Sequence, residues 1–395
     1  MNIKRPSAHL LLLALIYLAF VSLGLPDSVL GVAWPAMRIS LGQSLEAAGL
    51  LTMILTTCSA ISGFASGFVL RRLGTGKVVA ISGFLTGLAL LGFALAPSFH
   101  WIVLLTVPLG LGAGSVDAGL NHFVARHYSA RHMNWLHGCW GIGATIGPVV
   151  MGTALASRFG WHAGYLVIAL MQLALAALFA RHLRLWDNEP ASPAPDATPA
   201  PGAERALERA LPPVWARWLA PALFLVYTTI ELGTGLWAAS ILVEGRGAQP
   251  AQAGLWVAGF FGAIMVGRFA IGLVANRLGN RLLVRAGIGI AFVGAVLFAL
   301  PFVPDLFNLA GLVLLGLGCA PIYPSLMHEA TKRFDAATAR TVIGRQVAFA
   351  YLGCALGPAA LGLLGAHLGL WSVMPMICLA LLLLGWMNWR LDRVS

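Results

Sequence analysis

Charged residues are scarce in this sequence. They make up 10% of its 395 residues, against 59% hydrophobic residues, and only 14 of them are Asp or Glu. A water-soluble domain carries about 25% charged residues. The scarcity therefore excludes a water-soluble globular protein, and the length leaves room for about twelve membrane spans of roughly 20 residues each.

Several signatures of enzymes and metal sites are also missing. The chain has no phosphate-binding loop of the Gly-x-x-x-x-Gly-Lys-Ser/Thr type and no soluble segment that could hold a Ser, His and Asp arrangement. We therefore expect neither ATP hydrolysis nor another enzyme activity, and no cofactor. The spacing of cysteines and histidines predicts no metal site and no disulfide. The cysteines, all in apolar runs, are Cys58, Cys139, Cys319, Cys354 and Cys378.

Twelve apolar runs follow one another along the chain, and each predicts a transmembrane helix. The first run follows Lys4 and Arg5 and continues to about Trp34 without a small-residue cleavage site, which favours a membrane span over a signal peptide. The fold class predicted is an all-α membrane protein with twelve transmembrane helices. The predicted spans are 8–34, 46–70, 78–97, 99–124, 134–157, 162–183, 217–243, 251–275, 282–301, 306–329, 342–366 and 370–389.

Basic residues are distributed unevenly between the two sides of the predicted membrane. Most Lys and Arg lie in loops on the side of the termini, and only Arg38, Arg158 and Arg246 lie in loops on the other side. Cytoplasmic loops carry the excess of basic residues in membrane proteins. We therefore expect both termini in the cytoplasm, with the chain in a bacterial-type inner membrane, and we ascribe the net charge of +11 to this pattern.

A Pro- and Ala-rich segment divides the chain into two sets of six spans. Residues 185–215 cannot bury a core and predict a flexible cytoplasmic linker between bundles at 1–184 and 216–395. The two sets repeat one another, because three glycine motifs recur at offsets of 205, 206 and 210 residues. These motifs begin at Gly67 and Gly272, at Gly110 and Gly316, and at Gly143 and Gly353. Such a repeat predicts two pseudo-symmetric bundles around a central site.

Three acidic residues lie inside predicted spans: Asp27, Asp117 and Glu231. A charge within a membrane span costs a few kcal/mol or more unless it is paired, hydrated or protonated, so such residues commonly bind a proton, an ion or a substrate. Asn121 lies four residues after Asp117 and shares its helix face. For Glu231 the alternative is a structural role as the partner of a buried cation, for which Arg268 is a candidate.

The first of the repeated motifs resembles a loop of the major facilitator superfamily, Gly-x-x-x-Asp-Arg-x-Gly, which helps to fix conformational states in that family. It is matched at Gly67, Arg72 and Gly74, and again at Gly272, Arg277 and Gly279. Arg71 and Asn276 stand where the family has Asp, so the family's usual charge lock is not expected here. The resemblance covers essentially the whole chain and implies alternating access between two bundles.

Within that superfamily, the chain is most similar to fucose:proton symporters and related sodium-dependent glucose transporter-like permeases. The stretches that carry this resemblance begin at Leu25, Gly112, Leu136 and Glu231. It implies proton coupling and sugar recognition by Asp27 and Asp117. Further candidates for substrate binding are Asn121, His137, Trp140, Tyr227, Trp237, Tyr323, Gln346 and Tyr351, and the alternative for each aromatic residue is helix packing.

These features together predict secondary active transport, with proton-coupled symport of a sugar or similar small polar solute as the leading hypothesis. Coupling to Na⁺ stays open, because carboxylates bind either cation. The alternatives are a proton-coupled drug or metabolite exporter and a membrane sensor that binds solute without moving it. The expected partners are a small-molecule substrate and the lipid bilayer, with no nucleic acid, and one chain is sufficient for a complete pathway.

Overall fold

The protein is a bundle of long helices. A computed structural model describes residues 6–128, 130–186, 213–301 and 304–394. Within these residues twelve helical segments are long and apolar enough to cross a membrane, and there are no strands. The predicted fold class, an all-α membrane protein with twelve transmembrane helices, is confirmed.

Two of the twelve spans are each broken into two helices. The first consists of α1 and α2, separated at Ser28 just after Pro26, and the tenth consists of α11 and α12. The first seven helices are α1 (Pro6–Asp27), α2 (Val29–Ser40), α3 (Ala47–Leu73), α4 (Thr75–Ala94), α5 (Phe99–His127), α6 (Ala130–Leu155) and α7 (Gly160–Arg181), followed by the short η1 (Leu183–Leu185). The others are α8 (Ala216–Ser240) with its extension η3 (Ile241–Gly245), α9 (Pro250–Leu278), α10 (Asn280–Ala299), α11 (Asp305–Cys319), α12 (Ile322–Arg333), α13 (Ala336–Leu368), η4 (Leu370–Ser372) and α14 (Val373–Asp392).

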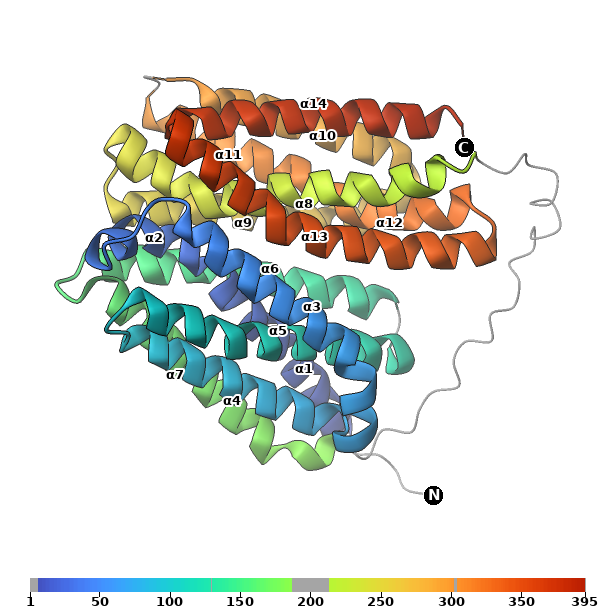
Figure 1. Ribbon diagram of the computed structural model, residues 1–395. Coiled ribbons are helices and arrows are strands. Elements are labelled where there is room, and N and C mark those ends of the chain that lie inside the picture. The colour runs from blue at the N-terminus through green and yellow to red at the C-terminus, as the bar shows by residue number, and fades with distance from the viewer. Residues whose placement is uncertain (1–5, 129, 187–212, 302–303, 395) are drawn as a thin grey trace.

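The helices form two groups that pack mainly among themselves. Helices α1–α7 make one group and α8–α14 the other, and the contacts between the groups run chiefly through α6 with α9, α3 with α13, and α2 with α8. Figure 1 shows the first group, in blue to green, below the second group, in yellow to red. Most of the predicted linker at 185–215 lies outside the described residues.

Two loops at equivalent places in the groups adopt the same backbone conformation. Gly74 joins α3 to α4 with φ +77°, and Gly279 joins α9 to α10 with φ +79°. Residues with a Cβ rarely adopt this left-handed region, so glycine permits the sharp turn between successive helices. The repeat read from the sequence thus extends to the turn geometry.

The two groups are in close contact at the end of the molecule opposite the termini, which we call the far end. Figure 1 shows the start of α1 and the end of α14 both at the other end, the termini end, at the lower and upper edges of the molecule. At the far end Arg38 of α2 donates two hydrogen bonds to the Glu244 carboxylate of η3, one of them from Nε to Oε1 at 2.9 Å. The first span reaches Ser40 rather than the predicted end near Trp34, which extends the helix to Arg38 at this contact.

Glycines allow the backbones of the two groups to approach one another at the far end. A Cβ on Gly31 of α2 would lie 2.5 Å from the carbonyl oxygen of Gly235 on α8, and a Cβ on Gly49 of α3 would lie 2.6 Å from Cα of Ala359 on α13. Helix interfaces in membranes use such small residues because association there relies on close van der Waals packing. The two groups are therefore joined at the far end by close backbone contact as well as by an ion pair.

We predict that Gly31→Val opens the far end, because the added side chain has no room against the carbonyl oxygens of α8. The measurement is the distance between spin labels at Ser44 and His367, two exposed residues of opposite groups at the far end, in a background without native cysteines. The distance is expected to lengthen and its distribution to broaden. Gly245→Val is the control, because a Cβ at Gly245 meets no atom within 4 Å. An unchanged distance in Gly31→Val would contradict the role of this contact.

Candidate functional site

Asp27 lies at the end of α1 and faces the region between the two helix groups. Its side chain is exposed although the neighbours Leu25 and Ser28 are buried, and Tyr351 of the second helix group lies within electrostatic range of it. Trp140 of α6 donates its indole N–H to a carboxylate oxygen of Asp27 at 2.8 Å. The break between α1 and α2 after Pro26 places the carboxylate at a point where the helix is interrupted.

Trp140 also contacts a charged pair in the other helix group. The guanidinium carbon of Arg268, on α9, lies 5.4 Å from the centre of the Trp140 ring, within the range of a cation–π interaction. Arg268 in turn pairs with Glu231 of α8 at 3.0 Å, and the Glu231 side chain is only 8% exposed. One chain of contacts therefore runs from a carboxylate of the first group, through Trp140, to an ion pair of the second group.

Arg268 is the cation that pairs with Glu231, as the alternative structural role of Glu231 predicts. A proton-coupling role for Glu231 stays a prediction.

Asp117 lies in the middle of the same region, on α5. Asn121 donates its side-chain amide to the Asp117 carboxylate at 3.0 Å and to its backbone carbonyl at 2.9 Å, as their shared helix face predicts. Asp117 is close enough to Asp27 for their charges to interact, and Tyr323 of α12 and Tyr351 of α13 lie within reach of the Asp117 charge. Among the described residues neither aspartate has an ion-pair partner. Two carboxylates that have no ion-pair partner in the described chain and two half-buried tyrosines thus lie within electrostatic range of one another.

Of the four other candidates, Tyr227 and His137 lie within electrostatic range of Arg268, and Tyr227 also of Glu231. Tyr227 and Trp237 are buried in α8, and their polar hydrogens are used in packing: Tyr227 donates to the carbonyl of Cys319 at 3.0 Å and Trp237 to that of Pro358 at 2.8 Å. Gln346 is buried on α13, and its amide oxygen has no partner in the described part of the chain. His137 is exposed, and its ring meets Phe20 edge to face at 5.6 Å.

The loop residues predicted to fix conformational states lie at the termini end. Gly67, Gly74, Gly272 and Gly279 are exposed, as are the arginines of both loops. Arg72 lies over the ring of Phe68 at 4.3 Å, a contact within its own helix. Their part in the conformational cycle stays a prediction.

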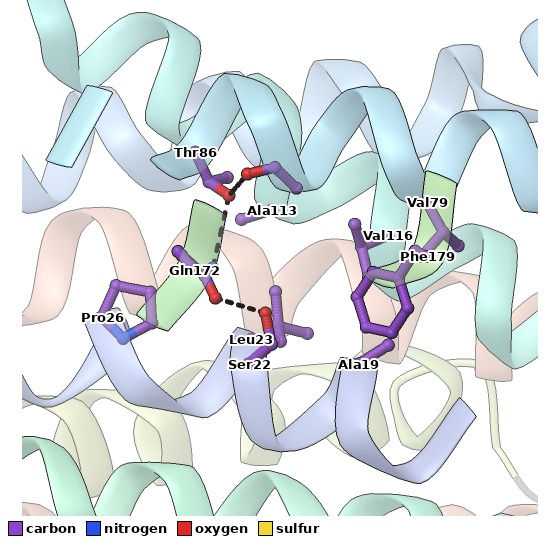
Figure 2. Close-up of a pocket in the computed structure, with 11 residues that line it drawn as sticks. Ala19, Ser22, Leu23, Pro26, Val79, Thr86, Ala113, Val116, Gln172 and Phe179 are labelled. Carbon is purple, nitrogen blue, oxygen red and sulfur yellow. Dashed lines mark hydrogen bonds between the residues drawn. The ribbon is translucent and has the colours of Figure 1, made fainter. Parts of the chain in front are cut away.

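A small cavity inside the first helix group is too small for a solute. It is a space of about 20 Å³, room for about one water molecule, between α1, α4, α5 and α7. Figure 2 shows Gln172 of α7 between Ser22 and Thr86, with its amide hydrogen-bonded to both hydroxyls. These bonds tie three helices of one group together.

The sequence analysis missed the ion pair between Arg38 and Glu244 at the far end. A signal for it was present, because the two residues are 206 positions apart, which is one of the offsets of the glycine motifs. Opposite charges at equivalent positions of two repeats can meet on the symmetry axis that relates them. The sequence analysis recorded Arg38 only as a basic residue in a loop.

Comparison with known proteins identifies the family. The model of the Major Facilitator Superfamily matches residues 16–344 and, in a second match, residues 219–394. The chain belongs to the Major Facilitator Superfamily. It is therefore a multi-pass membrane transporter rather than an enzyme, and it handles small molecules within a lipid bilayer.

The relatives of this superfamily member transport different solutes. The chain is 24% identical over 370 residues to the cis,cis-muconate transport protein of Acinetobacter baylyi, covering 90% of this chain and 87% of that protein. In fold it is similar to an inward-facing, unoccupied bacterial homologue of the human lysosomal transporter Spinster, with a TM-score of 0.79, 14% identity and coverage of 99% and 98%. It is also similar to a D-xylose-proton symporter, with a TM-score of 0.73, 16% identity and coverage of 94% and 96%. These likenesses do not confirm the fucose:proton symporter branch.

We predict that Arg268→Ala destabilises this superfamily member by about 3–5 kcal/mol, because it leaves the buried Glu231 carboxylate without its cation. The double variant Glu231→Gln with Arg268→Gln removes both charges, and its stability is expected to be closer to that of the wild type. The measurement is the apparent melting temperature of the purified protein in detergent.

Arg285→Gln is the control for that experiment. Arg285 is 57% exposed, and its partner Asp392 keeps a second arginine, Arg333, so the change should cost about 0–1 kcal/mol. A double variant as unstable as Arg268→Ala would show that the buried charge is not the cause of the loss.

Proposed function

We propose that this transporter couples the inward movement of a proton to that of a sugar or similar small polar solute. The observation that carries the proposal is that two carboxylates, Asp27 on α1 and Asp117 on α5, lie within electrostatic range of each other and have no ion-pair partner among the described residues. An unpaired carboxylate in a membrane interior is stable when it is hydrated or holds a proton. Such a pair can therefore accept a proton from one side of the membrane and release it on the other.

The side chains around the carboxylates suit a hydroxyl-bearing solute. Tyr323 and Tyr351 present aromatic rings and hydroxyl groups from the second helix group, and the Asp27 and Asp117 carboxylates add hydrogen-bond acceptors from the first. Aromatic rings pack on the apolar C–H faces of a sugar, while polar groups bind its hydroxyls. A D-xylose-proton symporter among the proteins of similar fold is consistent with this class of solute. Na⁺ in place of the proton stays open.

The contact between the groups supports alternating access. At the far end the groups are joined by Arg38 and Glu244 and by glycine contacts, and Trp140 and Arg268 connect them in the middle. Rocking of one group against the other would break the far-end contacts and expose the carboxylates to the opposite side. With the termini in the cytoplasm, as the basic loops suggest, the far end faces outward. A single chain is the proposed functional unit in a bacterial-type inner membrane.

We predict that Asp117→Asn abolishes proton-driven accumulation, because an amide does not take up and release a proton in this way. The measurement uses the purified protein in proteoliposomes, with a panel of monosaccharides added outside and the external pH recorded. The wild type should alkalinise the outside on addition of one sugar, and a potential of about 100 mV supports nearly fifty-fold accumulation. In the variant both the external alkalinisation and the accumulation of the sugar should be lost.

The matched control is Asp305→Asn, which makes the same chemical change at the start of α11, where the carboxylate accepts an exposed hydrogen bond from Gln252 at 2.9 Å. It should behave as the wild type. A sugar signal that survives in Asp117→Asn would refute the role of Asp117. No signal with any sugar, together with proton release from the lumen on addition of lipophilic cations or other metabolites, would instead identify an exporter.

A further inference from the structure

Three arginines at the termini end of the second helix group lie on tryptophan rings. Arg345 of α13 lies 4.1 Å from the ring centre of Trp218, Arg390 of α14 lies 5.8 Å from that of Trp215, and Arg393 lies 3.8 Å from that of Trp389. The three tryptophans are between 39% and 51% exposed. We call these six residues the Arg–Trp cluster.

The Arg–Trp cluster differs from the other basic residues at this end of the group. Arg281, Arg285 and Arg333 form ion pairs with Glu329 or Asp392 between α10, α12 and α14. The three arginines of the cluster have no acidic partner among residues 6–128, 130–186, 213–301 and 304–394. The acidic side chains nearest in sequence, Glu329 and Asp392, already serve other arginines. The cluster therefore carries three positive charges that the described protein does not neutralise.

The geometry of the cluster leaves hydrogen-bond donors available. Trp215 and Trp218 are three residues apart at the start of α8, so they share one helix face, and Arg390 and Arg393 are related in the same way on α14. Figure 1 shows the start of α8 beside the end of α14. A guanidinium that lies on an aromatic ring contacts the ring with the flat face of the guanidinium. The N–H donors of the guanidinium point outward in its own plane, along its edge. Those edges can bind phosphate oxygens.

We propose that the Arg–Trp cluster is a binding site for the phosphate headgroup of an anionic phospholipid. Exposed tryptophans of a membrane protein lie at the level of the lipid headgroups. The rings hold three unneutralised guanidinium groups at that level, where anionic lipids are the complementary charge. The site is separate from the region between the helix groups and independent of the transported solute.

The test is native mass spectrometry of the full-length protein, titrated with phosphatidylglycerol or with phosphatidylcholine of the same acyl chains. The wild type should bind phosphatidylglycerol more tightly than phosphatidylcholine. Each arginine near an anionic headgroup strengthens binding about fivefold, so Arg345→Gln, Arg390→Gln and Arg393→Gln together should reduce the preference by about a hundredfold. Added inorganic phosphate should not displace the lipid, and displacement would mean that the site binds free phosphate instead.

The control variant removes three charges from the first helix group at the same end, by Arg71→Gln, Lys77→Gln and Arg181→Gln. These residues are exposed and outside the cluster, so this variant should keep the preference. If both variants lost the preference for phosphatidylglycerol to the same extent, only the total charge would matter, and this result would overturn the proposal. So would the absence of any preference in the wild type.

A second measurement keeps the proposal testable if the triple cluster variant does not fold. A photoreactive phosphatidylglycerol is cross-linked to the wild-type protein, and the labelled peptides are mapped. Labels at the start of α8 and the end of α14 are expected, and labels confined to other helices would refute the site.

Discussion

A carboxylate within a membrane is stable only when it is paired, hydrogen-bonded, hydrated or protonated, and the architecture of this transporter follows from that constraint. Glu231 is paired with Arg268, and Asp117 is bonded to Asn121. Asp27 accepts a hydrogen bond from Trp140 and is otherwise exposed. Two carboxylates thus stay unneutralised between the groups. The contacts between the groups run along α6 and α9 as well as at the far end, where Arg38 pairs with Glu244.

Trp140 gives the two helix groups a shared element at this space. It binds Asp27 of the first group through its N–H and Arg268 of the second through its ring. Movement of one group against the other has to change at least one of these contacts. Trp140 therefore connects the Asp27 carboxylate of the first group to the Arg268–Glu231 pair of the second.

The helices were predictable from the sequence because apolar runs of membrane length are long and uninterrupted, and the number and order of spans agree with the structure. Arg268 could be named as a partner of Glu231 because few cations lie in the spans. The bond between Trp140 and Asp27 could not be predicted, because it depends on how α1 and α6 are rotated about their axes. The same holds for Tyr227 and Trp237, which the sequence suggests as solute contacts but whose polar hydrogens bind backbone carbonyls.

The ion pair between Arg38 and Glu244 joins equivalent positions of the two repeats and has a consequence for their history. In a symmetric dimer of identical single repeats, a residue on the axis meets its own copy. Two arginines or two glutamates would repel each other there. An attractive pair at this position requires the copies to differ in sequence, so this contact dates from after the duplication. A single chain can hold such a difference permanently, whereas a homodimer cannot.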